Sequence, residues 1–148
     1  MILISHRGNI DGKKPTRENS PDYILEAIEL GYDVEVDVWY ENGGLFLGHD
    51  KPEYETCITF LKNKKLWCHC KNTKALEILI KNNVHCFFHK TDDVTLTSYG
   101  YIWVFPRKPL LNGSVCVLPE VADYAKEELE KCAGICSDNI QDYGEMAK

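Results

Sequence analysis

Short apolar segments recur along the chain, and polar or amphipathic segments separate them. Seven of these segments have the length and composition of short strands: Met1–Ser5, Val34–Trp39, Leu66–Cys70, Val84–Phe88, Tyr101–Phe105, Ser114–Leu118 and Gly134–Cys136. Apolar runs that alternate with helical segments are typical of repeated strand–helix units around a parallel sheet. The pattern therefore predicts an α/β fold.

Four of the separating segments have helical character: Pro21–Leu30, Glu53–Asn63, Thr73–Lys81 and Val121–Lys131. The first has helix signals at both ends, with Ser20 as N-cap before Pro21 and Gly31 just after the last residue. For the third, Asn72 or Thr73 is the expected N-cap.

The length of 148 residues, 44% of them hydrophobic, fits one domain (residues 1–148) with a single core. An eight-unit barrel usually takes about 250 residues, so a barrel of this length needs very short connections. Asp92–Gly100, for example, is too short and too rich in turn residues for a crossover helix. The pattern alone allows a reduced barrel, closed or open, or a small doubly wound sheet.

Polar residues stand where the first apolar runs end. His6-Arg7-Gly8 follows the first run, Glu35 and Asp37 lie within the second, and His49-Asp50 comes shortly after it. Alternation places Glu35 and Asp37 on one face of a strand and the intervening valines on the other, where they can pack under helices. The turn signal Asn42-Gly43-Gly44 predicts a hairpin that sets position 37 opposite position 49.

This combination of groups suits cleavage of a phosphodiester. Two adjacent carboxylates repel each other unless a cation or proton lies between them, and oxygen ligands favour Mg²⁺ or Ca²⁺. The two imidazoles can serve as proton donor and acceptor, and they titrate near pH ~6.5. Positive charge on the phosphoryl oxygens would come from the cation or from Arg7.

On these residues the chain resembles the glycerophosphodiester phosphodiesterase family of the phosphatidylinositol-phospholipase-C-like superfamily, as a short divergent member. The matching motifs occur in the family's order: His6-Arg7-Gly8, Glu18-Asn19-Ser20, Ala27–Gly31, Glu35-Val36-Asp37-Val38 and Gly48-His49-Asp50. Gly134–Asp138 also resembles the family's last barrel strand. The resemblance implies a reduced TIM-type (β/α) barrel with parallel strands and a β-hairpin at the mouth.

The resemblance also implies a role for each motif. His6 and His49 would be the general acid and base, Arg7 and Lys71 would contact the phosphate, Glu35 and Asp37 would bind the metal, and Glu18 and Asn19 would support the site. At the third strand the family has a glutamate ligand where this chain has His69. Ligation by His69 would remove one negative charge and extend the choice of metal to Mn²⁺ or Zn²⁺; a hydrogen-bonded structural role is the alternative.

The remaining histidines, cysteines and aromatic residues are expected in structural positions. Cys68 and Cys70 point away from His69 on a strand and cannot share a metal with it. His85 and His89 are expected in polar loops, although the parity of His89 would also let it face the mouth. Four large aromatic residues are expected inside or around the mouth: Trp39, Trp67, Trp103 and Phe105. Ser137-Asp138 is expected at the rim or as a helix cap.

Charge and cysteine content restrict partners and location. The net charge of −6 without a basic cluster disfavours a nucleic-acid surface and adsorption to anionic membranes. The N-terminal apolar run is too short for a signal peptide, and no stretch has membrane-spanning length. Seven cysteines without a disulfide framework favour reduced thiols, so we expect a cytoplasmic protein.

The sequence thus predicts a metal-dependent phosphodiesterase acting on a small-molecule phosphodiester. Two other hypotheses stay open. The first is a non-catalytic barrel that serves as a phosphate-binding or regulatory module, and the second is a headgroup lyase that forms a cyclic phosphate. A second copy of the chain is a further candidate partner, because a trimmed barrel can leave an apolar face uncovered. The substrate alcohol and the assignment of acid and base to the two histidines also stay open.

Overall fold

The computed structural model describes residues 1–147 and places all seven expected strands in one parallel run. Their order across the sheet is β6-β5-β2-β1-β10-β9-β8, and each neighbouring pair is parallel. The bounds are β1 (Ile2–His6), β2 (Asp33–Glu41), β5 (Leu66–Cys70), β6 (Cys86–Phe88), β8 (Ile102–Val104), β9 (Val115–Val117) and β10 (Gly134–Ser137). The expected α/β class with a mainly parallel sheet is confirmed.

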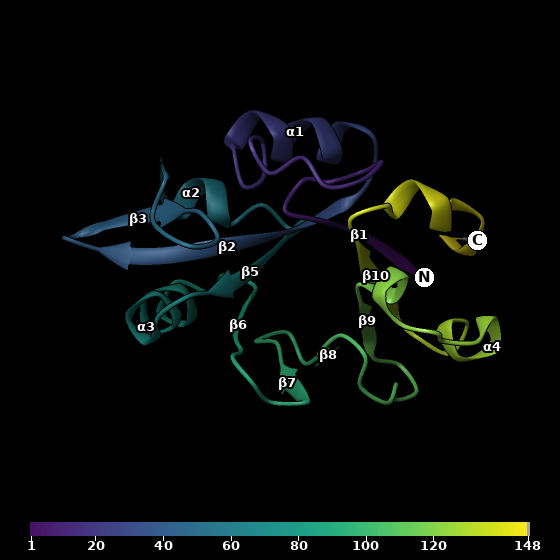
Figure 1. The fold of residues 1–148 in the computed structure, drawn as a ribbon. Coiled ribbons are helices and arrows are strands. Elements are labelled where there is room, and N and C mark those ends of the chain that lie inside the picture. The colour runs from purple at the N-terminus through teal and green to yellow at the C-terminus, as the bar shows by residue number, and fades with distance from the viewer. Residues whose placement is uncertain (148) are drawn as a thin grey trace.

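Three antiparallel strands complete the sheet. The hairpin of β2 and β3 (Gly44–Leu47) is extended by β4 (Tyr54–Thr56), and β7 (Val94–Leu96) pairs with β8. The strands curve around a common interior (Figure 1), but within residues 1–147 no strand ladder joins β6 to β7, so the sheet is not closed. Isolated hydrogen bonds span this gap, such as the one from Thr95 Oγ1 to the Phe88 carbonyl at 3.1 Å.

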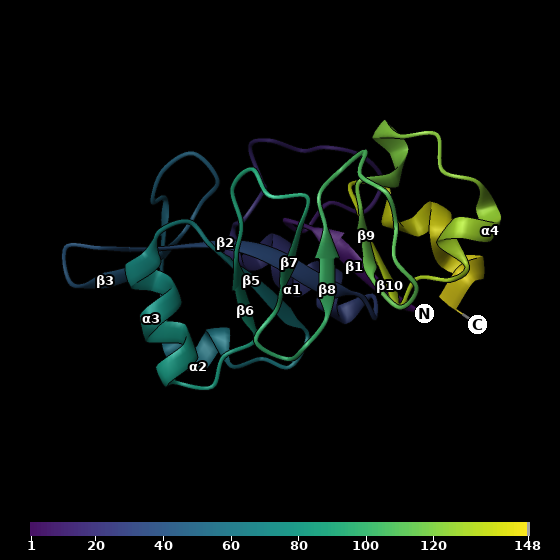
Figure 2. The same cartoon turned by 90° about the horizontal axis from the view of Figure 1, so that it is seen from below.

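Within residues 1–147, four α-helices and two 3₁₀ helices flank the sheet. They are α1 (Pro21–Glu29), α2 (Ile58–Leu61), α3 (Thr73–Lys81), α4 (Lys126–Leu129), η1 (Pro119–Val121) and η2 (Ile140–Ala147). Figure 2 shows the strands side by side, with α3 at one end of the molecule and α4 at the other. No helix in the described part of the chain has the length and apolarity needed to cross a bilayer.

The bounds of α3 agree with the prediction and α1 ends one residue earlier, at Glu29, whereas the other two helices are clearly shorter than predicted. The first part of Glu53–Asn63 pairs with β3 as strand β4, which leaves only one helical turn. In Val121–Lys131, the 3₁₀ turn of η1 and the extended backbone of Ala122 delay the helix to Lys126. The side chain of Asn72 caps α3 by accepting a hydrogen bond from the Ala75 amide at 2.9 Å.

The alternation predicted for β2 holds. Val34, Val36 and Val38 are fully buried in the layer between the sheet and its helices, together with Cys68 and Cys70. The opposite faces of the strands form an apolar floor inside the curved sheet: Ile4, Trp67, Phe87, Trp103, Val115, Val117 and Cys136. Two residues further along several of these strands, the same faces present polar groups at the carboxyl ends.

His85 does not lie in a polar loop as predicted. It is 5% exposed, its ring stacks on Tyr99 and lies against Trp67, each at 4.3 Å between ring centroids, and Nε2 is 2.9 Å from Thr97 Oγ1. Its position next to the strand that carries Phe87 explains the burial. Removal from water lowers the pKa of His85 from 6.5 to about 4.

This shift should make the protein less stable in acid. Between pH 6.5 and about 4 the unfolded chain binds a proton at His85 that the folded chain does not, so the free energy of unfolding falls as pH falls. The loss over this window should approach about 3 kcal/mol. Urea unfolding at several pH values should therefore show that the free energy of unfolding depends less steeply on pH for His85→Asn than for wild type. Equal slopes would contradict a lowered pKa of His85.

Candidate active site

A cavity of about 520 Å³ opens at the carboxyl ends of β1, β2 and β5, and six of the predicted site residues line it: His6, Arg7, Glu35, His49, His69 and Lys71. Asp37 lies directly behind this surface with no exposed area. Glu18 and Asn19 contact these residues from outside the cavity. The structure thus brings all nine predicted site residues together around one cavity.

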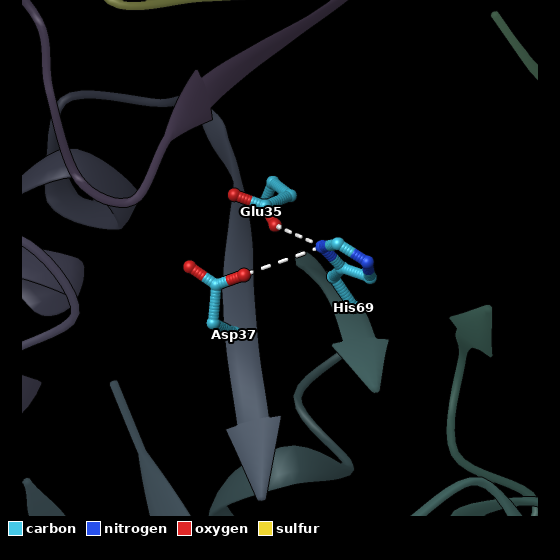
Figure 3. A group of neighbouring side chains, drawn as sticks. All are labelled: Glu35, Asp37 and His69. Atoms are coloured by element: carbon cyan, nitrogen blue, oxygen red, sulfur yellow. Dashed lines mark ion pairs between the residues drawn. The ribbon is translucent and has the colours of Figure 1, made fainter. Parts of the chain in front are cut away.

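Glu35, Asp37 and His69 form a compact group of potential metal ligands. One ligand atom from each lies within 4.8 Å of the others (Figure 3). His69 Nδ1 is 3.7 Å from Glu35 Oε1 and 3.2 Å from Asp37 Oδ1, because β5 pairs with β2 so that His69 stands opposite Asp37.

The orientation of the His69 ring shows what this group can bind. His69 Nε2 lies 3.0 Å from the carbonyl oxygen of His89, which can only accept, so Nε2 carries a proton. With the proton on Nε2, Nδ1 is the ring nitrogen that faces the two carboxylates, and a cation bound between them would take up its lone pair. Within residues 1–147, Glu35 Oε2 and Asp37 Oδ1 are buried without a hydrogen-bond partner. A nitrogen and unsatisfied carboxylate oxygens arranged in this way fit a divalent cation.

The two carboxylates have different electrostatic surroundings. Burial and the neighbouring charge of Asp37 raise the pKa of Glu35. Burial alone would raise the pKa of Asp37 too, but His49, His69 and the charges of Arg7 and Lys71 outweigh it and hold this pKa well below its usual range. Asp37 is therefore ionised at neutral pH, and charge on Glu35 is disfavoured without a bound cation.

Asp37 is fixed by several contacts. Its Oδ2 is 3.0 Å from Arg7 Nε and accepts a hydrogen bond from Asn19 Nδ2 at 2.9 Å, and its Oδ1 is 3.4 Å from Lys71 Nζ. Arg7 is held from its other side by Glu18, whose Oε2 accepts from Nη1 at 3.2 Å. Glu18 and Asn19 therefore hold Arg7 and Asp37 in place.

His6 is oriented by Asp138. Its Nδ1 donates to Asp138 Oδ1 at 2.7 Å, which turns Nε2 toward the cavity at 3.8 Å from Glu35 Oε2. Burial acts to lower the pKa of His6, but the hydrogen bond to Asp138 and the charge of Glu35 outweigh it and raise this pKa. Asp138 is held in turn by Asn9 Nδ2 at 2.8 Å and by Glu120, which accepts its backbone N–H at 2.8 Å.

The sequence indicates a rim position or a helix cap for Asp138, but not its hydrogen bond with His6. Its parity with Cys136 at the end of β10 was the available signal. Asn9 and Glu120 carry no comparable signal, because their contacts depend on how distant loops meet. His89 was assigned to a polar loop, yet it is 8% exposed and lines the cavity; burial lowers its pKa.

His49 reaches Asp37 by a different register than predicted. The ladder pairs Val38 with Leu47, so residue 37 stands opposite Gly48 and not opposite His49. The chain leaves β3 at Gly48, whose φ of +148° redirects the backbone. His49 Nδ1 consequently lies 3.4 Å from Asp37 Oδ2, on a side chain that is 41% exposed.

Gly48 is required for this arrangement. A Cβ at this position would overlap the carbonyl oxygen of Lys51. Gly48→Ala should displace His49, and a displacement of about 1 Å can lower turnover about 10²-fold. Gly43→Ala is the matched control, because Gly43 also has positive φ but an added Cβ meets nothing within 4 Å. Steady-state assays of both variants, with the phosphodiester proposed below as substrate, check this expectation. Equal activities of the two variants would contradict it.

Comparison of the chain with models of protein families, with curated proteins and with solved structures gives no match. The function proposed next therefore depends on the residues and their geometry.

Proposed function

We propose that this protein is a metal-dependent phosphodiesterase that hydrolyses a glycerophosphodiester-like substrate by general acid–base catalysis with two histidines. The observation that carries the proposal is the cavity itself. His6 and His49 come from separate segments and flank two carboxylates with unsatisfied oxygens, next to the fixed cations Arg7 and Lys71. The resemblance of the motifs to the glycerophosphodiester phosphodiesterase family supports the same reaction.

We also propose that the fold is a reduced TIM-type barrel with the β2–β3 hairpin at its mouth. The seven parallel strands and β7 surround one interior (Figure 1), which supports this proposal. The cavity lies at the carboxyl ends of the strands, where barrels of this type place their chemistry.

Glu35, Asp37 and Nδ1 of His69 would hold the metal. A divalent cation bound there supplies charge stabilisation to the phosphoryl oxygens as they become more negative. The carboxylates suit Mg²⁺ or Ca²⁺, and the imidazole extends the choice to Mn²⁺ or Zn²⁺. Arg7 and Lys71 line the same cavity and would bind the remaining phosphoryl oxygens.

The two histidines would move the protons. One imidazole takes a proton from the attacking water molecule, and the other gives a proton to the departing alkoxide. His6 is prepared for either role, because Asp138 fixes its tautomer, leaves Nε2 free toward the cavity and stabilises the protonated ring. His49 faces the same cavity from the hairpin side and is oriented by Asp37.

Turnover of bis(p-nitrophenyl) phosphate tests this function. Protein treated with a chelator should be inactive, and addition of Mg²⁺, Ca²⁺, Mn²⁺ or Zn²⁺ should restore p-nitrophenol release. With a glycerophosphodiester, ³¹P NMR should show a phosphomonoester; a cyclic phosphate would identify a lyase. Absence of turnover with all four metals, together with retained binding of phosphate, would favour the non-catalytic barrel.

A further inference from the structure

One side of the cavity is apolar, and the proposed chemistry does not use it. Away from β2 and β5, which carry Glu35 and His69, the cavity is lined by Trp103, Phe105, Val117 and Leu118, which we call the apolar wall. Trp103 and Val117 belong to β8 and β9 and are part of the apolar floor. Phe105 and Leu118 follow directly after these two strands, at the level of the polar site.

Leu118 has an unfavourable backbone conformation. Its φ of 49° and ψ of 58° lie in the left-handed region, which a bulky L-residue seldom adopts. Hydrogen bonds hold it there, since its N–H donates to the Cys136 carbonyl at 2.7 Å and its carbonyl accepts from Val121 at 3.0 Å. Glycine or asparagine would fit this conformation with less strain. What leucine adds at this position is apolar surface facing the cavity.

The charges around the cavity limit what can lie against the apolar wall. Among the residues that line the cavity, Glu35 is the one acidic side chain, and it belongs to the metal group on the other side. The lining cations are Arg7, Lys71 and Lys90. The nitrogens of His89, beside Phe105, are buried and hydrogen-bonded to none of residues 1–147. A cationic headgroup would lack a counterion there, and a polyol would find few exposed partners.

We propose that the substrate carries one uncharged apolar ester arm, alkyl or aryl, which lies against the apolar wall while its phosphate lies at the polar side. This inference rests on the proposed function and names its substrate class. The cavity of about 520 Å³ is within the range of small-molecule sites, so it can hold both parts of such a ligand.

Binding of alkyl methylphosphonate anions tests this without requiring turnover. The full chain with Mn²⁺ is titrated calorimetrically with the methyl, butyl, hexyl and octyl esters. Affinity should rise about two- to fourfold for each methylene that is buried. A benzyl ester is compared with the hexyl ester, and the tighter of the two assigns the arm as aryl or alkyl.

Two variants locate the effect. Leu118→Asn keeps a residue that tolerates positive φ but removes the apolar surface, so the gain with chain length should shrink. Phe105→Ala should do the same, and because Phe105 is already 36% exposed, its replacement spares the core. Leu111→Asn is the control, because Leu111 is an exposed leucine that does not line this cavity.

Three outcomes are distinguishable. A chain-length dependence that both wall variants flatten supports the inference. Equal affinity for all esters in wild type overturns it but leaves the phosphate site of the proposed function intact. If no ester binds and the metal assay also shows no turnover, the proposed function fails and the inference fails with it.

Discussion

Replacing His6 by alanine is expected to lower kcat for a phosphodiester about 10²- to 10⁴-fold, the usual contribution of a general acid or base. The reason is geometric: Nε2 of His6 is its one nitrogen free to exchange protons in the cavity, because Nδ1 is bound to Asp138 at 2.7 Å. KM should change much less, since the proposed phosphate-binding residues Arg7 and Lys71 are unchanged. Steady-state kinetics with a saturating metal measures both constants.

His85→Asn provides the matched control for this loss. It replaces another buried histidine that does not line the cavity, so turnover at neutral pH should stay close to that of wild type. A His6→Ala protein that folds like wild type and retains more than a third of its activity would rule out a catalytic role for His6.

The pH profile then assigns the role of His6. Asp138 helps to raise the pKa of His6, so Asp138→Asn should lower this pKa. If His6 is the base, it must be deprotonated to act, and the ascending limb of the profile moves to lower pH. If His6 is the acid, the descending limb moves to lower pH. A profile in which neither limb moves would show that His6 does not set the pH dependence.

The parts of the molecule that local pattern controls could be predicted from the sequence. Strand β2 is the best example, because the alternation of valines with Glu35 and Asp37 fixes which face packs under helices and which bears the carboxylates. Asn72 and Gly31 likewise mark the ends of helices by their own chemistry. The candidate site residues on these elements could be grouped from the sequence because strand ends of a parallel sheet meet on one side.

The parts that were wrong depend on contacts between distant segments. Glu53–Asn63 was predicted as one helix, but Tyr54–Thr56 pairs with β3, and no local pattern reports that partner. The register of the hairpin differs by one residue, because the two-residue turn Asn42-Gly43 closes it earlier. The pairing of His6 with Asp138 joins opposite ends of the chain, and it needed the order of strands before it could be inferred.

The second large effect is expected from two isosteric replacements at adjacent carboxylates, which should change stability in opposite directions. In metal-free protein Glu35→Gln should raise Tm, because burial and the charge of Asp37 make ionised Glu35 unfavourable and one of its buried oxygens has no partner. The raised pKa of Glu35 leads to the same expectation. The free energy of unfolding that depends on protonated Glu35 is present in acid and is lost as pH rises through this pKa.

Asp37→Asn should lower Tm. It leaves Arg7 and Lys71 without their buried counter-charge, and breaking such a pair costs about 3–5 kcal/mol, which corresponds to a fall in Tm of roughly 10 °C. The depressed pKa of Asp37 predicts a loss of wild-type stability as pH falls through that pKa, a loss that the asparagine variant no longer shows.

Metal then separates function from stability at these two positions. At 100 times its Kd, a bound cation should stabilise wild type by about 2.7 kcal/mol, and both variants should lose most of this gain because each lacks one anionic ligand. Thermal unfolding of wild type and both variants, with and without Mn²⁺, measures the Tm change caused by each substitution and the Tm gain from metal in each protein. If Mn²⁺ raises the Tm of Glu35→Gln as much as that of wild type, Glu35 is not a ligand. If the two variants shift Tm in opposite directions without metal and both lose the Tm gain from Mn²⁺, the site gives up folding stability to bind a cation.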